Sequence, residues 1–483
     1  MKGGVITVRH MLKVQVDKTN PMFGYFETMT KSANNLKNAI RFRQRQVLTA
    51  VEKDPAVLTP NEQEIMEEIA HCLPQMNLIA PKRDDKPIRF QMPTKGNSFL
   101  STSFLEYLFR ASNNQNYFCK DLPRQVAQHV IKEAVEDMSS FFATIRAYNQ
   151  DPSKFKGRPR LPGYGAHGGC QAVTLTNQIC ILYATGTGET ELKFPFTNMR
   201  LPLGKAPIAG KLKEVKVIPS HGIFIVLLSI DDGKKFPKSA ETTTRACCID
   251  LGVSNFAAIT NNLGLPCLLF KGGVPKSINQ WYNKRMSKIQ SEQTTRTGKK
   301  FVPTPESRKL ELWRENHLND YMSKTAKLII RWCAENHIDA IIIGVNQDWK
   351  QGVNMGAKNN QEFVSIPYAK FRWQLAYRAE RAGIKIIERE ESYTSRASFL
   401  DNDFIPTVGE PGADQVKFSG RRTKRGLYRS KDKTTINADF NGSANIGRKE
   451  IPDLFTRGVA PDFGHVLIYK HPDMPPVERK VKM

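Results

Sequence analysis

This 483-residue sequence has no paired cysteines, no long apolar run and few acidic residues for its length. Its eight cysteines are scattered and none lies in a Cys-x-x-Cys pair, so we expect reduced, mostly buried cysteines and no disulfide framework. There is no apolar stretch that could span a bilayer, no basic amphipathic helix at a terminus and no signal peptide. These absences favour a cytoplasmic protein without a membrane partner.

The scarcity of acids leaves a strong positive charge. Lys and Arg number 72 against 47 Asp and Glu, which gives a formal net charge of +25. Solubility does not require such an excess, and it indicates a polyanionic partner, with nucleic acid first. The hydrophobic content of 40% is that of a folded protein, and the length predicts two to four domains.

One acid stands inside a segment that is otherwise apolar. Ala246–Thr260 holds a short apolar run with Asp250, then Gly252, then a second apolar run, which predicts a buried strand, a tight turn and a returning strand. A buried carboxylate costs several kcal/mol unless a positive charge compensates it, so Asp250 is a candidate metal ligand. A turn-capping Asp at the end of a strand is the alternative.

Two further acids stand at the ends of predicted core elements. Glu391 closes the strand 384–391, with Glu390 next to it, and Asp439 lies at the start of a predicted helix over 436–448. Strand alternation is expected to place Glu388 and Glu390 on one face and Glu391 on the other. Acids from separate elements of one α/β layer can hold two Mg²⁺ ions ~3.5–4 Å apart for phosphodiester hydrolysis. A solvated glutamate cluster and a first-turn Asp are the alternatives.

Basic residues gather in several segments that could contact phosphates. A helix over about 23–53 carries i, i+4 cations, a proline-rich linker over 151–164 carries more, and the end of the insertion 392–435 is densely basic. A solvated face is the alternative for the helix, and a solvated flexible loop is the alternative for the insertion. The candidate nucleic-acid-binding residues are Lys37, Arg41, Arg45, Lys154, Lys156, Arg158, Lys350, Arg421, Arg422 and Arg425.

Three short segments resemble a known family. Ile249–Val253, Glu391–Ser395 and Asn437–Ile446 are similar to the split RuvC-like motifs of TnpB, the transposon-encoded RNA-guided endonuclease, and its type V CRISPR relatives. The segment 122–164 resembles the family's transition from helical recognition domain to wedge barrel. The resemblance implies a multidomain α+β protein with an RNase H-like α/β nuclease domain, Mg²⁺ held by Asp250, Glu391 and Asp439, and guide RNA and target double-stranded DNA as partners of a monomer.

The expected domains follow from this resemblance and from the composition. They are a small β-barrel wedge domain over 1–22 and 151–244, a helical recognition domain over 23–150, a split RuvC-like domain over 245–391 and 436–450, a basic target-nucleic-acid-binding insertion over 392–435, and a tail over 451–483.

The chain departs from the family in two places. The usual middle glutamate follows the second strand, where this chain has Gly344 and Val345, and Glu391 takes the place that it has in some other members. Ser398 and Asp401 stand where a zinc ribbon would have its first cysteines, so no structural zinc is expected. The first hypothesis is therefore an RNA-guided DNA endonuclease. An RNA-guided repressor that no longer cuts and an RNA-independent transposase or resolvase are the alternatives.

Overall fold

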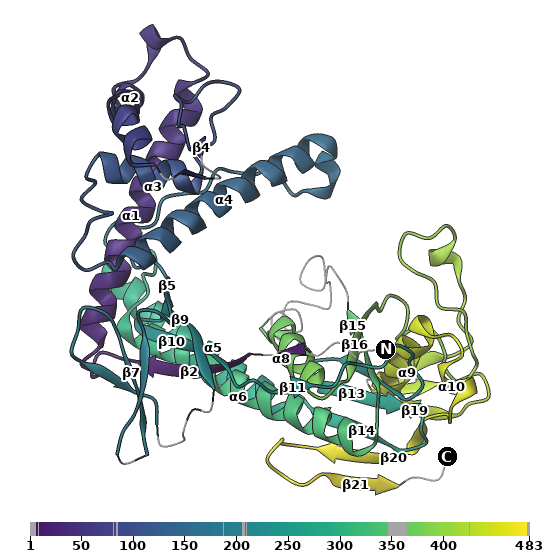
Figure 1. Ribbon diagram of the computed structural model, residues 1–483. Helices are drawn as coiled ribbons and strands as arrows, with labels where there is room; N and C mark the ends of the chain where they lie inside the picture. Colours follow the sequence, from purple (N-terminus) through teal and green to yellow (C-terminus); the bar gives the residue numbers. More distant parts are fainter. Residues whose placement is uncertain are drawn as a thin grey trace. The chain divides into compact units, whose positions relative to one another are not determined.

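The computed structural model describes residues 6–7, 9–80, 82–83, 86–186, 188–204, 208, 210–345, 365–424 and 426–480. Two compact units divide the chain, one formed by 9–233 and the other by 1–8 together with 234–483. The chain is a mixed α/β protein (Figure 1). No helix in the described ranges is long and apolar enough to cross a membrane.

The unit 9–233 joins helices and antiparallel strands around one core. It contains the expected recognition segment 23–150 and most of the expected wedge, whereas 1–8 and 234–244 of the expected wedge belong to the other unit. Its helices are α1 (Phe23–Ala50), α2 (Pro60–Ile79), α3 (Thr102–Ala111) and α4 (Arg124–Gln150). Its strands are β2 (His10–Val16), β3 (Lys82–Arg83), β4 (Lys86–Pro87), β5 (Val173–Thr176), β6 (Ile181–Ala184), β7 (Thr190–Lys193), β8 (Arg200–Pro202), β9 (Lys211–Ser220) and β10 (Ile223–Asp231).

Local sequence explains these elements. Phe26, Met29, Ala33, Leu36 and Ile40 recur at helical spacing in α1 and are all buried. A reciprocal cap between Thr59 and Glu62, followed by a proline in the first turn, starts α2. The strands form sheets of order β2-β10-β9-β5, β6-β7-β8 and β3-β4, and β2 pairs with β10 far along the chain, as in Val16 with Phe224.

The other unit is built on a seven-stranded sheet of order β16-β15-β12-β13-β14-β20-β21. Its strands are β12 (Ala246–Leu251), β13 (Asn255–Asn261), β14 (Pro266–Lys271), β15 (Ala340–Val345), β16 (Lys385–Glu390), β20 (Asp462–Tyr469) and β21 (Val477–Lys480). Its helices are α5 (Gly273–Thr297), α6 (Pro305–Glu335), α8 (Tyr368–Arg381), α9 (Ala438–Glu450) and α10 (Leu454–Arg457). Two short strands, β1 (Ile6–Thr7) and β11 (Lys235–Phe236), pair apart from this sheet.

One prediction needs correction here. The segment 451–483 is not a tail, because β20 pairs in parallel with β14 and extends the sheet, and β21 pairs with β20. Apolar residues at alternate positions of β20, such as Val466, are buried in an apolar cluster of the sheet. The insertion 392–435 contains strands β17 (Arg421–Lys424) and β18 (Leu427–Arg429), which form a sheet with β19 (Thr435–Asn437) at its end.

The core of the 9–233 unit gives a stability prediction. Leu36 is fully buried in α1, whereas Leu78 of α2 is 77% exposed. We expect Leu36→Ala to lower the free energy of unfolding by about 2–5 kcal/mol, because the surrounding helices cannot close the cavity completely. Leu78→Ala, measured by the same chemical denaturation, should change it by less than about 0.5 kcal/mol. Equal effects of the two variants would contradict this packing.

Candidate active site

Strand alternation decides which face of the sheet carries Asp250. In β12, Cys247 and Ile249 join the core cluster that includes residues of α6 and α8. Ala246 and Cys248 instead join a cluster with Ile446 of α9. Asp250 follows Cys248 by two positions, so its carboxylate points to the α9 face.

Helix α9 lies unusually close to β12 at this point. A Cβ atom on Gly442 would lie 2.7 Å from Oδ2 of Asp250, and one on Gly447 would overlap Sγ of Cys248. Between them, Ser443 Oγ donates a hydrogen bond of 2.6 Å to the carbonyl of Cys248. The small residues of α9 therefore bring its N-terminal turn, which carries Asp439, next to the strand that carries Asp250.

Polar partners on several elements hold Asp439. Asn437 caps the helix by accepting a 2.8 Å hydrogen bond from the Asp439 N–H. Asn255 Nδ2 donates to Asp439 Oδ2 at 2.6 Å, and Lys271 Nζ donates to Asn255 Oδ1 at 2.9 Å. Arg422 Nη2 of the basic insertion lies 3.1 Å from Asp439 Oδ1. The third acid is thus connected both to the sheet and to the insertion.

The main chain around Glu391 is fixed on both sides. Its N–H donates to the carbonyl of Val345 at 3.2 Å, and its carbonyl accepts from Thr394 Oγ1 at 2.8 Å. A Cβ on Gly344 would lie 2.6 Å from Oε2 of Glu391. The glycine at the end of β15, near the family's usual glutamate, therefore leaves space for a carboxylate that comes from the neighbouring strand.

The three predicted acids line one cavity of about 770 Å³. Among the described residues, no three His, Cys, Asp or Glu side chains gather tightly enough to form a ready cluster for a single ion. Asn255, Lys271 and Arg422 also line the cavity. The sequence pattern does not place Asn255 and Lys271 in the site; the signal for Asn255 is a polar residue directly after the Asp250 turn, at the start of a buried strand.

The electrostatics of the cavity favour a cation. Burial raises the pKa of Asp250 well above its ordinary value, and the charges of Glu391 and Asp439 raise it further. The positive charge of Arg422 acts in the opposite direction, but it does not compensate. An ionised Asp250 therefore needs more positive charge than these protein groups supply.

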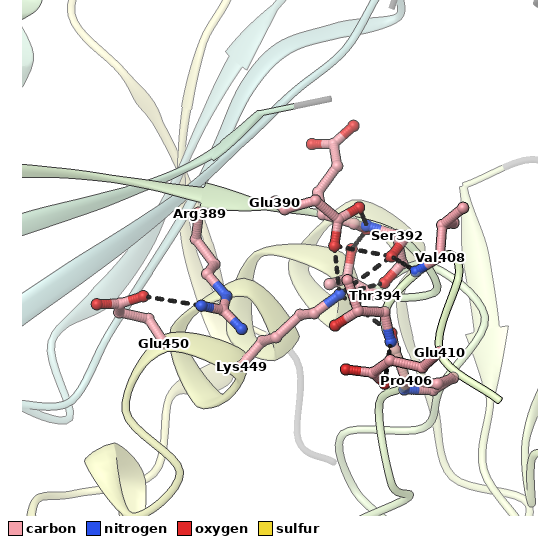
Figure 2. A network of polar contacts seen from close by, with 11 residues as sticks. Arg389, Glu390, Ser392, Thr394, Pro406, Val408, Glu410, Lys449 and Glu450 are labelled. Carbon is pink, nitrogen blue, oxygen red and sulfur yellow. Dashed lines mark hydrogen bonds and ion pairs between the residues drawn. The ribbon is translucent and has the colours of Figure 1, made fainter. Parts of the chain in front are cut away.

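The neighbours of Glu391 have other partners. Glu388 pairs with Arg372 of α8 at 2.8 Å. Glu390 instead pairs with Lys449 of α9 at 2.6 Å and accepts hydrogen bonds from Ser392 (Figure 2). Burial favours a higher pKa for Glu390, but these donors outweigh it and lower the pKa below its ordinary value. The expected alternation therefore fails at the end of β16, because Glu388 and Glu390 bind helices α8 and α9 respectively.

The predicted basic residues fall into two groups. Lys154, Lys156, Arg158, Arg421 and Arg422 have exposed side chains, and Lys350 and Arg425 lie outside the described residues. In α1, however, Lys37 is only 7% exposed and lies 3.1 Å from Asp137 of α4.

The other two cations of α1 also bind protein groups. Arg41 pairs with the same Asp137 and donates to the carbonyl of Gly163, and Arg45 donates to the carbonyl of Pro162. Lys37, Arg41 and Arg45 thus connect helix α1 to α4 and to the linker 151–164. Nucleic-acid contact by Lys37, Arg41 and Arg45 stays a prediction, and the contacts in the structure are with protein.

Comparison with known proteins places this site in a family context. Residues 227–350 match the OrfB_IS605 family model, described as a probable transposase, and residues 368–446 match the Cas12f1-like TNB domain. No curated protein matches the chain in sequence. The resemblance to TnpB-type proteins and their type V CRISPR relatives is therefore confirmed.

Solved structures with a similar chain include three effector complexes. The Cas12f1–sgRNA–target DNA complex has a TM-score of 0.47 and 12% identity, covering 86% of this chain and 83% of that one. CasPhi-2 (Cas12j) bound to crRNA has a TM-score of 0.36 and 10% identity, and the match covers 95% of this chain and 100% of that one. C2c1 of Alicyclobacillus acidoterrestris with single-guide RNA has a TM-score of 0.32 and 10% identity, and the match covers 86% of this chain and 70% of that one.

The raised pKa of Asp250 gives a prediction about pH. The native state keeps a proton on Asp250 at pH values where the unfolded chain has released it, so ionising this group destabilises the metal-free fold as pH rises above the ordinary value of ~3.9. Asp250→Asn removes the ionisation. We expect the variant to be more stable than the parent in EDTA at neutral pH, with the difference shrinking as the pH falls toward 4. Melting temperatures across a pH series test this, and a pH-independent difference would contradict it.

Proposed function

We propose that this chain is an RNA-guided DNA endonuclease that cuts guide-matched DNA beside a short flanking motif by metal-dependent phosphodiester hydrolysis. The observation that carries the proposal is the cavity lined by Asp250 of β12, Glu391 after β16 and Asp439 of α9, beside Lys271 and Arg422. Acidic side chains that can bind cations, bordered by basic ones that can bind phosphates, are the arrangement that two-metal nucleases need.

The residues at this site fit magnesium. Carboxylate oxygens are the ligands that Mg²⁺ prefers, and two glycines leave room for the carboxylates of Asp250 and Glu391. Asp250, Glu391 and Asp439 would hold two Mg²⁺ ions. When bound, the ions supply Lewis-acid activation and neutralise charge on the phosphate. Asn255 orients Asp439 through its 2.6 Å hydrogen bond, and Lys271 in turn holds Asn255.

The surroundings of the site support a nucleic-acid substrate. The basic sheet β17-β18-β19 leads directly into α9, so the proposed DNA-contacting strands are continuous with the helix that carries Asp439. Residues 368–446, which match the TNB domain, span this sheet. We assign 245–391 and 436–450, extended by β20 and β21, to the RuvC-like nuclease domain, and 392–435 to target binding.

The other unit receives the remaining domain roles. We assign the strands of the 9–233 unit to the wedge and its helices to guide and target recognition, with pairing to the guide RNA supplying sequence specificity. This assignment follows the family resemblance. The shared core of these helices and strands would make them hold the guide–target duplex as one body.

Substitution of the glutamates tests the proposed metal ligands. We expect Glu391→Gln to reduce cleavage of guide-matched plasmid in Mg²⁺ by about 100-fold or more, because it removes a charged ligand at the cavity. Glu388→Gln is the matched control, since Glu388 is half-exposed and pairs with Arg372 away from the cavity. Asp250→Ala should abolish cleavage while guide-RNA binding stays within a few-fold.

The same assay separates the alternatives. A parent protein that binds guide RNA and target DNA but does not cut in Mg²⁺ would be the repressor, and one that copurifies with no RNA would be a transposase or resolvase. EDTA should stop cleavage by the parent. Full activity of Glu391→Gln, with loss in Glu390→Gln, would make Glu390 the ligand.

The basic sheet gives a separate prediction. Arg421 and Lys424 are exposed on β17, whereas Arg422 of the same strand pairs with Asp439. We expect the double variant Arg421→Ala/Lys424→Ala to weaken target-DNA binding and to reduce the slope of log affinity against log salt by about 2, because two phosphate contacts are lost. Lys470→Ala/Arg479→Ala, which removes two exposed cations elsewhere in the same unit, is the control. An unchanged salt slope in the first variant would exclude DNA contact by β17.

A further inference from the structure

Lys449 lies in the last turn of α9. It neither lines the cavity nor belongs to the basic sheet β17-β18-β19. Its side chain is 3% exposed, and its Nζ lies 2.6 Å from Oε2 of Glu390. The same Nζ donates to the carbonyl and the hydroxyl of Ser392, both at 3.1 Å, and to the carbonyl of Pro406 at 3.1 Å. Figure 2 shows these partners converging on the ammonium group from β16, from the turn after it and from the insertion.

These contacts surround Glu391 in the sequence. Glu390 precedes it, and Ser392, which follows it, donates from both its N–H and its hydroxyl to the Glu390 carboxylate, at 2.6 and 2.8 Å. The resulting ring of contacts fixes the turn in which Glu391 lies. It also occupies the Glu390 carboxylate with three donor groups, so that Glu391 alone of this pair lines the cavity.

The position of Lys449 on α9 gives it a second effect. Asp439 lies in the first turn of the same helix, ten residues earlier, or about 15 Å along the axis. One rigid helix therefore carries the third acid at one end and, at the other, the cation that holds the turn of the second acid. The contact with Pro406 adds the insertion to the same point, and Val408 N–H also donates to Ser392 Oγ at 3.2 Å.

We propose that Lys449 is a positioning residue for the metal site, which fixes Glu391 toward the cavity by clamping Glu390 and Ser392. The inference rests on the proposed function and adds a residue to it. Lys449 does not touch the reacting groups and acts through the turn that contains Glu391. Partners of this kind typically change metal affinity or activity by 10–100-fold.

A neighbouring ion pair provides a matched control. Arg389 of β16 lies 3.6 Å from Glu450 of α9, so this pair joins the same two elements one residue away on each (Figure 2). No described contact links it to Ser392 or Pro406. Arg389→Met therefore removes an ion pair between the same strand and helix without releasing the turn.

The test compares Lys449→Met with Arg389→Met in the full chain with bound guide RNA. We expect Lys449→Met to raise the Mg²⁺ concentration for half-maximal cleavage about 10-fold or more, and to weaken Mn²⁺ binding, followed by electron paramagnetic resonance, by a similar factor. Arg389→Met should change neither, and Lys449→Arg should recover part of the loss. Glu390→Gln should show a smaller loss in the same direction, which keeps the test valid if Lys449→Met does not fold.

The outcomes separate the two proposals. A parent protein that neither binds Mn²⁺ nor cuts would overturn the proposed function itself. A parent that binds Mn²⁺, with unchanged Mn²⁺ affinity in Lys449→Met and Glu390→Gln, would overturn the inference alone. A lower melting temperature with the same metal dependence, or equal effects of Lys449→Met and Arg389→Met, would mean that Lys449 only stabilises the fold.

Discussion

The close packing of α9 against β12 and β15 is the constraint on which the candidate site depends. Gly442 allows the helix to approach Asp250, and Gly344 leaves room for Glu391 and for Ile446 of α9. A side chain at either glycine would push the helix or a carboxylate away. Because α9 also carries Asp439 and Lys449, any shift of this helix would move the third acid and release the turn of the second acid together.

Burial sets the electrostatic problem that the site must solve. Three acids meet at one cavity, and Arg422, the protein cation that lowers the pKa of Asp250, pairs directly with Asp439. Arg422 belongs to the basic sheet proposed to contact DNA. Phosphates that attract Arg422 would compete with Asp439 for it, so substrate binding and the charge balance of the acids would be linked through one side chain.

The strands that carry the candidate acids could be predicted from sequence more reliably than the roles of the basic residues. The Asp250 hairpin has a local signature, and the structure forms it as β12 and β13. Cations at i, i+4 give the same sequence pattern on a solvated helix as on a helix whose cations bind acids of another helix. The sequence therefore does not indicate that Lys37 is buried against Asp137. Pairing of β20 with β14, nearly 200 positions apart, is likewise fixed by tertiary contacts.

The position of the middle glutamate shows why sequence alignment alone would misjudge this chain. Strands β15 and β16 run parallel, and Val345 is in register with Glu390, so Glu391 comes directly after the paired end of the sheet. Neighbouring strands lie only about 4.8 Å apart, a distance that a glutamate side chain can cross. Gly344 removes the Cβ that would block this reach. Under the proposed function, Glu391 after the next strand would take the place of the family's usual glutamate after β15, so the absence of that glutamate alone would not argue for an inactive protein.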